Sequence, residues 1–335
     1  MTRKFIMLLA VLMLVLSIAA CGNQSATTTD ETDSAASEET MTDEGSEAES
    51  DSTDEAMTDE AMTDEEPMTD TIVMSFVPSG DSQEIVASGD EIAKLLSDAT
   101  GMTIEANVAT SYAAVVEAMC AGQAQVGWLN TFSYILAHER DCADIALATI
   151  RFGEPFYTGQ IIANVDSGIT SLEDITAETK VCWVDELSTS GYIIPEIAMK
   201  AAGIDTEALD AQFLGSHDNV ANGVYNGDCE VGATFVDARG NIEDEHPDVM
   251  EKVIVIETSP EIPNDTVSFA SSLPEETRAT LTKALLDMAG TEEGAAALAA
   301  VYEIDGLVEK DDSFYDAFRT QLDAAGVNVE DFQEE

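Results

Sequence analysis

From residue 71 onward, apolar and polar positions alternate in the way that is typical of strands and helices in turn. Strand-like runs are TIVMSFVPS, MTIEANVAT and AQVGWLN, and helical spacing separates them in GDEIAKLLSDAT and SYAAVVEAMCAG. The pattern continues with KVCWVDE, a helix after STSG, AQFLGS, and a further helix and strand within HDNVANGVYNGDCEVGATFVDA. This rhythm predicts an α/β fold in which helices cover a parallel sheet.

Two segments of the chain are similar to each other at a constant offset. Residues 111–127, SYAAVVEAMCAGQAQVG, align without gaps on residues 216–232, SHDNVANGVYNGDCEVG. The matching pairs are Ser111/Ser216, Val115/Val220, Gly122/Gly227, Val126/Val231 and Gly127/Gly232. The alternative explanation is the general likeness of all helix–strand units, but the ungapped match favours two similar lobes. Ligands of open α/β sheets bind beyond the carboxyl ends of the strands, so the repeat places Tyr112 and His217 on opposite walls of a cleft.

Three hydroxyl residues stand in a row before the apolar segment GYIIPEI. One hydroxyl suffices to cap a helix, and here Ser188, Thr189 and Ser190 follow one another. A helix N-terminus has unpaired N–H groups and a partial positive charge. We therefore expect a seat for a tetrahedral oxyanion, built without lysine or arginine, with Gly191 letting the ligand approach the backbone.

The N-terminus has the pattern of an export signal. Arg3 and Lys4 precede an apolar run, and small residues precede Cys21. A transmembrane helix is the alternative, but the apolar stretch is shorter than the roughly 20 residues that span a bilayer. The segment resembles a bacterial lipobox, which implies a signal peptide over residues 1–20 and lipidation of Cys21.

Residues 21–70 are expected to be a disordered tether. Residues 22–70 contain 18 of the 67 acidic residues of the chain and no Lys or Arg, and they have almost no large apolar side chains. The rest of the chain is also acidic, which excludes nucleic-acid binding, since that needs a basic surface. Such a surface favours solubility and requires an anion site to rely on local donors.

Four cysteines remain after Cys21. An even number in an exported protein indicates two disulfides with three possible pairings. The predicted elements favour Cys120–Cys142, from the end of one helix to the loop after the next, and Cys182–Cys229, between two strands. Zinc bound by His138 and Cys142 is the alternative, although nothing nearby completes a ligand set, so we expect no metal and no cofactor.

Several motifs together resemble the solute-binding components of ABC importers for phosphonate, phosphite or phosphate. The motifs are SFVPSGD, SYAAVVEAM, VGWLNTFSY, LSTSGYIIP, GSHDNVANGVYNGD, VGATFVDAR and SPEIPND. The resemblance runs from about residue 71 to the C-terminus and implies a type II periplasmic-binding fold, two α/β lobes joined by two crossover strands. Lobe 1 would comprise residues 71–163 and 264–335, and lobe 2 residues 164–263, with hinges near residues 162–166 and 258–265.

The resemblance also implies a set of ligand-binding residues. Oxyanion donors would be Tyr112, Ser188, Thr189, Ser190 and His217. Further cleft residues would be Tyr157, Asn130 and Thr131. Asp265 would face the protonated side of the ligand. Asp237 falls near the position at which aminophosphonate binders hold the ligand ammonium. If it faces the cleft, an aminophosphonate is favoured, and if it lies outside, phosphite or phosphate.

The expected protein is thus a monomeric, lipid-anchored, extracytoplasmic substrate-binding protein and not an enzyme. It would pass a small phosphorus oxyanion to an ABC permease and its ATPase. A hydrolase is one alternative, because Ser188 or Ser190 with His217 and Asp265 are the residue types of a triad, but a G-x-S-x-G motif is absent. A lipid-tethered sensor module is the other.

Overall fold

The computed structural model describes residues 71–332. The expected signal peptide, Cys21 and the expected acidic tether lie outside these residues. Within them, none of the helices combines the length and the apolar character needed to cross a membrane.

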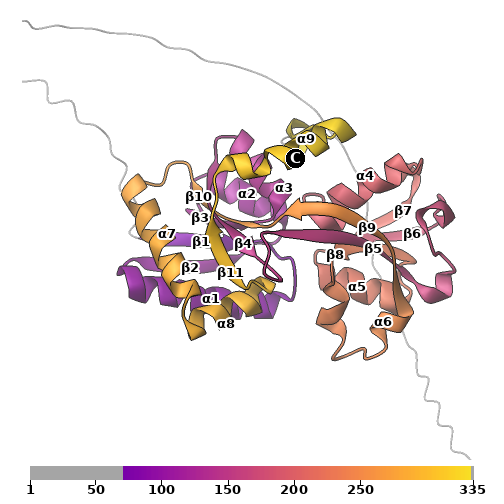
Figure 1. The fold of residues 1–335 in the computed structure, drawn as a ribbon, viewed down its shortest axis with the longest axis horizontal. Helices are drawn as coiled ribbons and strands as arrows, with labels where there is room; N and C mark the ends of the chain where they lie inside the picture. The colour runs from indigo at the N-terminus through magenta and orange to yellow at the C-terminus, as the bar shows by residue number, and fades with distance from the viewer. Residues whose placement is uncertain (1–70, 333–335) are drawn as a thin grey trace, which may run out of the picture. The chain divides into compact units, whose positions relative to one another are not determined.

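The first sheet has six strands in the order β11-β4-β10-β3-β1-β2. Its strands are β1 Thr71–Phe76, β2 Thr103–Val108, β3 Val126–Leu129, β4 Ala143–Ile150, β10 Thr266–Ala270 and β11 Gly306–Glu309. β1 pairs in parallel with β2 and β3, and β10 is antiparallel to β3 and β4. The helices grouped with this sheet are α1 Ser82–Thr100, α2 Tyr112–Cys120, α3 Thr131–Glu139, α7 Glu275–Ala289 and α8 Glu292–Tyr302 (Figure 1).

The second sheet has five strands in the order β7-β6-β8-β5-β9. Its strands are β5 Phe156–Asn164, β6 Lys180–Trp183, β7 Asp210–Phe213, β8 Val231–Phe235 and β9 Val253–Pro263. Its helices are α4 Ile194–Ala201, α5 His217–Asn226 and α6 Val249–Lys252, and α9 Asp316–Ala325 follows near the C-terminus. β6 is parallel to β7 and β8, whereas β5 runs antiparallel to β8 and β9. The predicted α/β class with two sheets is confirmed.

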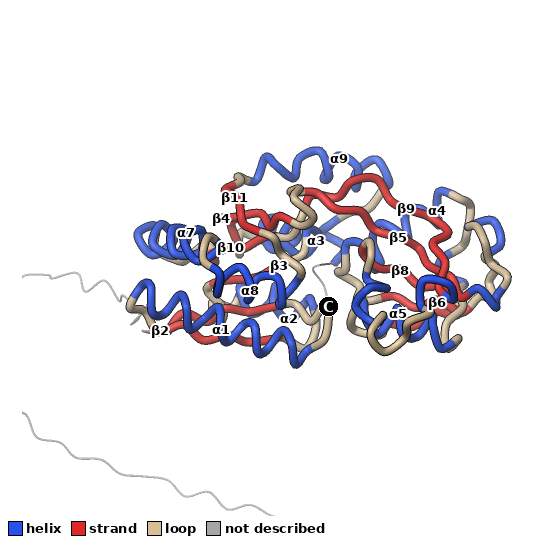
Figure 2. Tube along the Cα trace, turned by 60° about the horizontal axis from the view of Figure 1, so that its bottom comes forward, coloured by secondary structure: helices blue, strands red, loops and turns tan. Residues whose placement is uncertain are grey.

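The chain passes between the two sheets at two short connections. It leaves the first sheet after Ile150 and joins the second at Phe156, and it returns between Pro263 and Thr266. β5 and β9 lie side by side along the second sheet, as Figure 2 shows. The exact lobe boundaries at residues 163 and 264 stay predictions.

The internal repeat has a structural basis in helix caps and turns. Ser111 and Ser216 cap α2 and α5, and each hydroxyl accepts a hydrogen bond at 3.2 Å from the N–H three residues on. Gly122 and Gly227 lie in the turns directly after these helices, with φ angles of 70° and 79°, in the left-handed region that favours glycine. The matched serines and glycines therefore mark the start of the helix and the turn after it in both lobes.

The two strand glycines of the repeat serve helix packing. A Cβ on Gly127 would lie 2.3 Å from the Met119 sulfur, and a Cβ on Gly232 would lie 2.6 Å from Val220 Cγ1. A Cβ at either position would force the facing helix side chain to shift, so in each lobe the helix packs closely on the strand backbone.

Both predicted disulfides are present. Cys120 is bonded to Cys142 with 4.6 Å between the Cα atoms, and Cys182 to Cys229 with 5.9 Å. In this structure the Cys142 sulfur is bonded to Cys120, so it does not pair with His138 as a zinc ligand.

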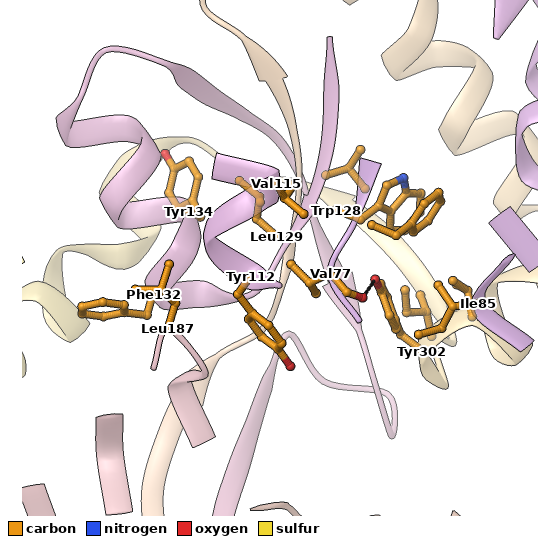
Figure 3. Packing of buried hydrophobic residues seen from close by; sticks show 14 of the residues in the cluster. Val77, Ile85, Tyr112, Val115, Trp128, Leu129, Phe132, Tyr134, Leu187 and Tyr302 are labelled. Atoms are coloured by element: carbon orange, nitrogen blue, oxygen red, sulfur yellow. Dashed lines mark hydrogen bonds between the residues drawn. The ribbon is translucent and has the colours of Figure 1, made fainter. Parts of the chain in front are cut away.

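The core of the first lobe fixes the loop after β1. Phe76 stacks on Trp128 with 5.4 Å between the ring centroids, and both side chains are buried. The Tyr302 hydroxyl at the end of α8 donates a hydrogen bond to the Val77 carbonyl at 2.6 Å (Figure 3). This bond ties residues 77–79 to the core, next to the site described below.

Candidate functional site

A small cavity lies where residues from both lobes meet. The space open to the centre of a water-sized sphere is about 20 Å³, slightly more than one water molecule needs. The cavity is therefore small, and side chains from both lobes enclose it. The residues that line it are Val77, Ser79, Tyr112, Asn130, Arg151, Tyr157, Ser188, Thr189, Ser190, His217, Phe235 and Asp265.

Four helical segments begin at this cavity. Tyr112 and His217 are the first residues of α2 and α5, and Asn130 caps α3. Thr189 opens a five-residue π-helical turn, Thr189–Ile193, which continues into α4. The cavity therefore faces several helix N-termini, which carry unpaired N–H groups and a partial positive charge.

Eight of the ten predicted ligand-binding residues line the cavity, and Thr131 and Asp237 do not. The Thr131 hydroxyl donates to the Pro263 carbonyl at 2.6 Å, so it anchors α3 to the end of β9. The Asp237 carboxylate accepts hydrogen bonds from Arg239 and Gln160. Burial acts to raise the pKa of Asp237, but these hydrogen bonds lower it overall.

The three adjacent hydroxyl residues have different hydrogen-bond roles. The Ser188 hydroxyl accepts the Gly191 N–H at 3.2 Å and so caps the π-helical turn. The Thr189 hydroxyl oxygen accepts from Asn130 Nδ2 at 2.8 Å and from the Phe132 N–H at 3.0 Å. Within the described residues, Ser190 neither caps the turn nor bridges the lobes.

Gly191 has a different role from the predicted one. A Cβ at this position would lie 2.3 Å from Val184 Cγ2 and 2.7 Å from the Ser188 hydroxyl. The prediction that Gly191 lets a ligand approach was wrong. The glycine instead makes room for the turn to pack on Val184, which follows β6 and holds the hydroxyl cluster in place.

Tyr112 and His217 both reach the cavity, as the repeat predicts. The Tyr112 hydroxyl is buried and has no hydrogen-bond partner among the described residues. Burial, and next the Asp185 charge, raise the pKa of Tyr112 well above its usual value, so the phenol keeps its proton. A buried donor without a partner is costly, so this hydroxyl is a candidate to donate a hydrogen bond to a ligand.

His217 is a neutral donor. Its Nδ1 accepts the Phe235 N–H at 3.3 Å, so the tautomer assigned by this contact carries its proton on Nε2. Burial, and then the Arg151 charge, lower the pKa of His217 to about 3. The imidazole therefore offers an N–H at neutral pH without a charge.

Arg151 is the cavity residue that sequence reasoning missed, and the expectation of a site without arginine was wrong. It follows β4, is 6% exposed, and its Nη2 lies 3.2 Å from Asp265 Oδ2. Its Nε is buried and has no partner among the described residues. The signal that could have revealed it is a lone basic residue at the end of the strand-like run IALATI, directly before the turn FGEP.

Asp265 lies between β9 and β10 and pairs with Arg151. Burial raises the pKa of Asp265, while the Arg151 charge opposes the rise. Tyr157, on β5, lies close by, and burial and then the Asp265 charge raise its pKa. Ser79, Val77 and Phe235 complete the wall and were also missed, although Ser79 stands in the quoted motif SFVPSGD.

Asn130 joins the two lobes beside the cavity. Its Nδ2 donates to the Leu187 carbonyl at 2.7 Å as well as to the Thr189 hydroxyl, while its Oδ1 is buried without a partner among the described residues. Two further bonds link the lobes, from the Tyr112 N–H to Asp185 at 3.3 Å and from the His217 N–H to the Ser79 carbonyl at 2.9 Å.

The arrangement does not form a hydrolytic triad. In such a triad the histidine donates its Nδ1 proton to the carboxylate. Here Nδ1 of His217 accepts a backbone N–H, and the Asp265 carboxylate is engaged by Arg151. Residues 71–332 also contain no group of three or more His, Cys, Asp or Glu side chains placed to hold a metal ion.

Comparison with known proteins identifies relatives for most of the described chain. A family model described as "ABC transporter, phosphonate, periplasmic substrate-binding protein" matches residues 74–315. The phosphate-import protein PhnD of Mycolicibacterium smegmatis is 31% identical over 182 residues, 51% of this chain and 56% of that protein. The phosphonates-binding periplasmic protein of Escherichia coli is 26% identical over 183 residues, 53% and 54% of the two chains. The match thus spans about half the length of these curated relatives.

Solved structures share the fold. A binding protein component of an ABC phosphonate transporter from Pseudomonas aeruginosa superposes with a TM-score of 0.68 at 25% identity, covering 74% of this chain and 84% of that one. PhnD1 from Prochlorococcus marinus, in complex with methylphosphonate, superposes with a TM-score of 0.69 at 16% identity. This superposition covers 77% of this chain and 99% of that one. The two lobes thus have the predicted type II periplasmic-binding architecture.

Proposed function

The chain belongs to the ABC-transporter family of phosphonate periplasmic substrate-binding proteins, and from that premise we propose that it captures a small phosphorus oxyanion for import. Phosphate, phosphite and small phosphonates are the ligands in question. The family consists of substrate-binding transport proteins and not of enzymes, so the hydrolase alternative has no support from it.

The observation that carries this proposal is the donor set of the cavity. The Tyr112 hydroxyl and Arg151 Nε are buried donors without partners among the described residues. The neutral His217 adds an Nε2–H, and Thr189 and Ser190 add hydroxyl groups at the start of a helical turn. Such donors suit the several oxygens of a tetrahedral oxyanion, and each hydrogen bond to a charged group contributes about 1.5–3 kcal/mol.

The Asp265 carboxylate should favour the binding of a protonated oxyanion over an unprotonated one. An ionised carboxylate accepts a short, strong hydrogen bond from a P–OH group. Sulfate has no proton to give at neutral pH, and its charge would stand next to the Asp265 carboxylate. We therefore propose that monoprotonated phosphorus species bind and that sulfate is rejected.

Calorimetry with phosphate, phosphite, methylphosphonate and sulfate tests the proposal. We expect stoichiometric binding of at least one phosphorus ligand, with no turnover of a phosphate ester, and sulfate binding weaker by at least about tenfold, or ~1.4 kcal/mol. Wild-type sulfate binding as tight as that of the best phosphorus ligand would exclude this role of Asp265.

An amide at position 265 sharpens the test. Asp265→Asn should weaken the phosphorus ligand and narrow the gap to sulfate, because the amide can donate and Arg151 loses its counter-charge. Asp312→Asn is the matched control. Asp312 accepts hydrogen bonds from Tyr134 and Arg319 and does not line the cavity, so its loss should leave the selectivity unchanged.

The membrane anchor, the location and the transport partners of the protein also follow from the family resemblance as proposals. We propose that Cys21 carries the lipid, that the chain works on the extracytoplasmic side of the membrane, and that an ABC permease and its ATPase receive the ligand. Cys21→Ser should move the protein from the membrane fraction to the soluble fraction without changing ligand affinity. Retention of the variant in the membrane fraction would contradict lipid anchoring at this cysteine.

A further inference from the structure

Two aspartates near the cavity are candidates to receive a positively charged group of a ligand, and an arginine already holds each of them. Asp265 is paired with Arg151 at 3.2 Å. Asp237 accepts from Arg239 through both oxygens, at 2.8 Å from Nε and 2.5 Å from Nη2, and from Gln160 at 2.9 Å. Bidentate bonds of this kind are among the strongest that a carboxylate forms.

Only the pair of Arg151 and Asp265 belongs to the cavity wall. Arg151 is almost fully buried, and its guanidinium carbon lies 5.5 Å from the centroid of the Phe235 ring. The arginine uses one terminal nitrogen for Asp265, while its Nε has no partner among the described residues. It therefore balances the carboxylate and still has a donor for an oxyanion.

The charge balance of this pair restricts the ligand. An oxyanion whose substituent is a hydrogen, a hydroxyl or a methyl group meets the donors, and Arg151 balances the charge of the Asp265 carboxylate beside it. An ammonium substituent would instead come close to the buried guanidinium, and like charges repel strongly where water is scarce. Arg151 also contacts one oxygen of the Asp265 carboxylate, and its positive charge weakens the attraction of that carboxylate for an ammonium group. The small cavity leaves little space for an aminoalkyl arm.

We infer that Arg151 is a specificity-determining residue, which restricts the cavity to phosphorus oxyanions with a small uncharged substituent and excludes aminoalkyl phosphonates. This inference rests on the proposed function and names the substrate class of the same site. Arg151 occupies the position beside Asp265 at which the ammonium group of an aminoalkyl ligand would have to bind.

Calorimetric titration of the full chain with methylphosphonate and 2-aminoethylphosphonate tests the inference. We expect the wild type to bind methylphosphonate at least about tenfold more tightly. Arg151→Gln should reduce this preference by at least about tenfold, because the freed carboxylate attracts the ammonium and repels the oxyanion. Arg239→Gln is the matched control, since it breaks the other arginine–aspartate pair and should leave the preference within about twofold of the wild type.

The outcomes separate the inference from the function on which it rests. A wild type that binds 2-aminoethylphosphonate as tightly as methylphosphonate, or an Arg151→Gln variant with an unchanged ratio, overturns the inference alone. If Arg151→Gln does not fold, the wild-type ratio decides together with Arg151→Lys, which keeps the charge and should keep the preference. A wild type that binds neither phosphonate, nor phosphate or phosphite, overturns the proposed function and the inference with it.

Discussion

At the scale of single residues, the hydroxyl cluster contains one serine that caps a helical turn and one that does not, so ligand binding and capping can be tested separately. Ser188 and Ser190 are both buried, but only Ser188 accepts a backbone N–H of its own turn. Ser190→Ala should weaken binding of the phosphorus ligand at least about tenfold and leave the melting temperature nearly unchanged. Ser188→Ala should also destabilise the ligand-free protein, by about 1 kcal/mol, because a cap is lost.

Thr291→Ala is the control for this pair. Thr291 caps α8 through the Gly294 N–H and does not line the cavity. Its loss should lower stability to a similar degree and leave affinity intact. Calorimetry and thermal unfolding of the three variants give both readouts, and unchanged affinity in Ser190→Ala would show that the oxyanion seat lies elsewhere.

The buried His217 predicts a pH dependence of stability. Its pKa is about 3 in the folded protein, whereas an unfolded chain has an ordinary histidine near 6.5. As pH falls, the unfolded state therefore binds a proton at this histidine before the folded state does. The free energy of unfolding is unaffected by His217 above about pH 6.5 and decreases progressively between pH 6.5 and pH 3. Lowering the pH from 7 to 5 should therefore reduce the free energy of unfolding by about 2 kcal/mol through this histidine.

Burial raises the pKa of Asp185, Asp218 and Asp265. These aspartates change the free energy of unfolding with pH in the opposite direction to His217. The effect of the histidine is therefore measured as the difference between the wild type and a variant that lacks it. Urea unfolding of wild type and His217→Gln at both pH values isolates the histidine. The difference in unfolding free energy between the two proteins should change by about 2 kcal/mol in favour of the variant at the lower pH. A constant difference would mean that His217 is not buried as a neutral side chain.

At the scale of elements, the π-helical turn depends on its glycine. A Cβ on Gly191 meets Val184 and the Ser188 hydroxyl at less than a contact distance, so Gly191→Ala should destabilise the protein by about 1–3 kcal/mol and weaken binding. Gly240→Ala is the control, because a Cβ there meets no atom within 4 Å. Equal stability of the two variants in urea unfolding would contradict the packing role of Gly191.

Elements are also the scale at which sequence reasoning was most successful. Ser111 and Ser216 could be predicted as caps because hydroxyl side chains satisfy helix N–H groups locally, whatever the rest of the fold does. The repeat gave the register of α2 and α5, so Tyr112 and His217 could be placed at one cavity. Thr131 shows the limit, because its hydroxyl bonds Pro263, 132 residues further along the chain, which no local pattern indicates.

At the scale of the whole described region, the hydrogen bonds between the lobes indicate a closed arrangement. Asn130 binds Leu187 and Thr189, and the chain passes between the sheets only at residues 151–155 and 264–265. The first predicted hinge, residues 162–166, begins inside β5, where Ile162 pairs with strands on both sides. We therefore expect the hinges at residues 151–155 and 264–265, and the lobes to open when the ligand leaves.

Spin labels on cysteines introduced at Lys94 and Glu207, both exposed and one in each lobe, would measure this motion. The distance between the labels should shorten when the phosphorus ligand is added. Asn130→Ala, which removes two bonds between the lobes, should leave more of the open population and lower the affinity about tenfold. Identical distance distributions with and without ligand would contradict closure.

The sequence by itself determined the features that depend on short stretches of chain: the order of strands and helices, the caps, the two similar units and the row of three hydroxyls. Only the tertiary structure decided which charges meet. Arg151 and Asp265 are 114 residues apart and become partners because both connections between the sheets end at the cavity. Asp237 is held outside the lining by Arg239 and Gln160. Charge pairing depends on distance in space, and a one-dimensional pattern does not contain that distance.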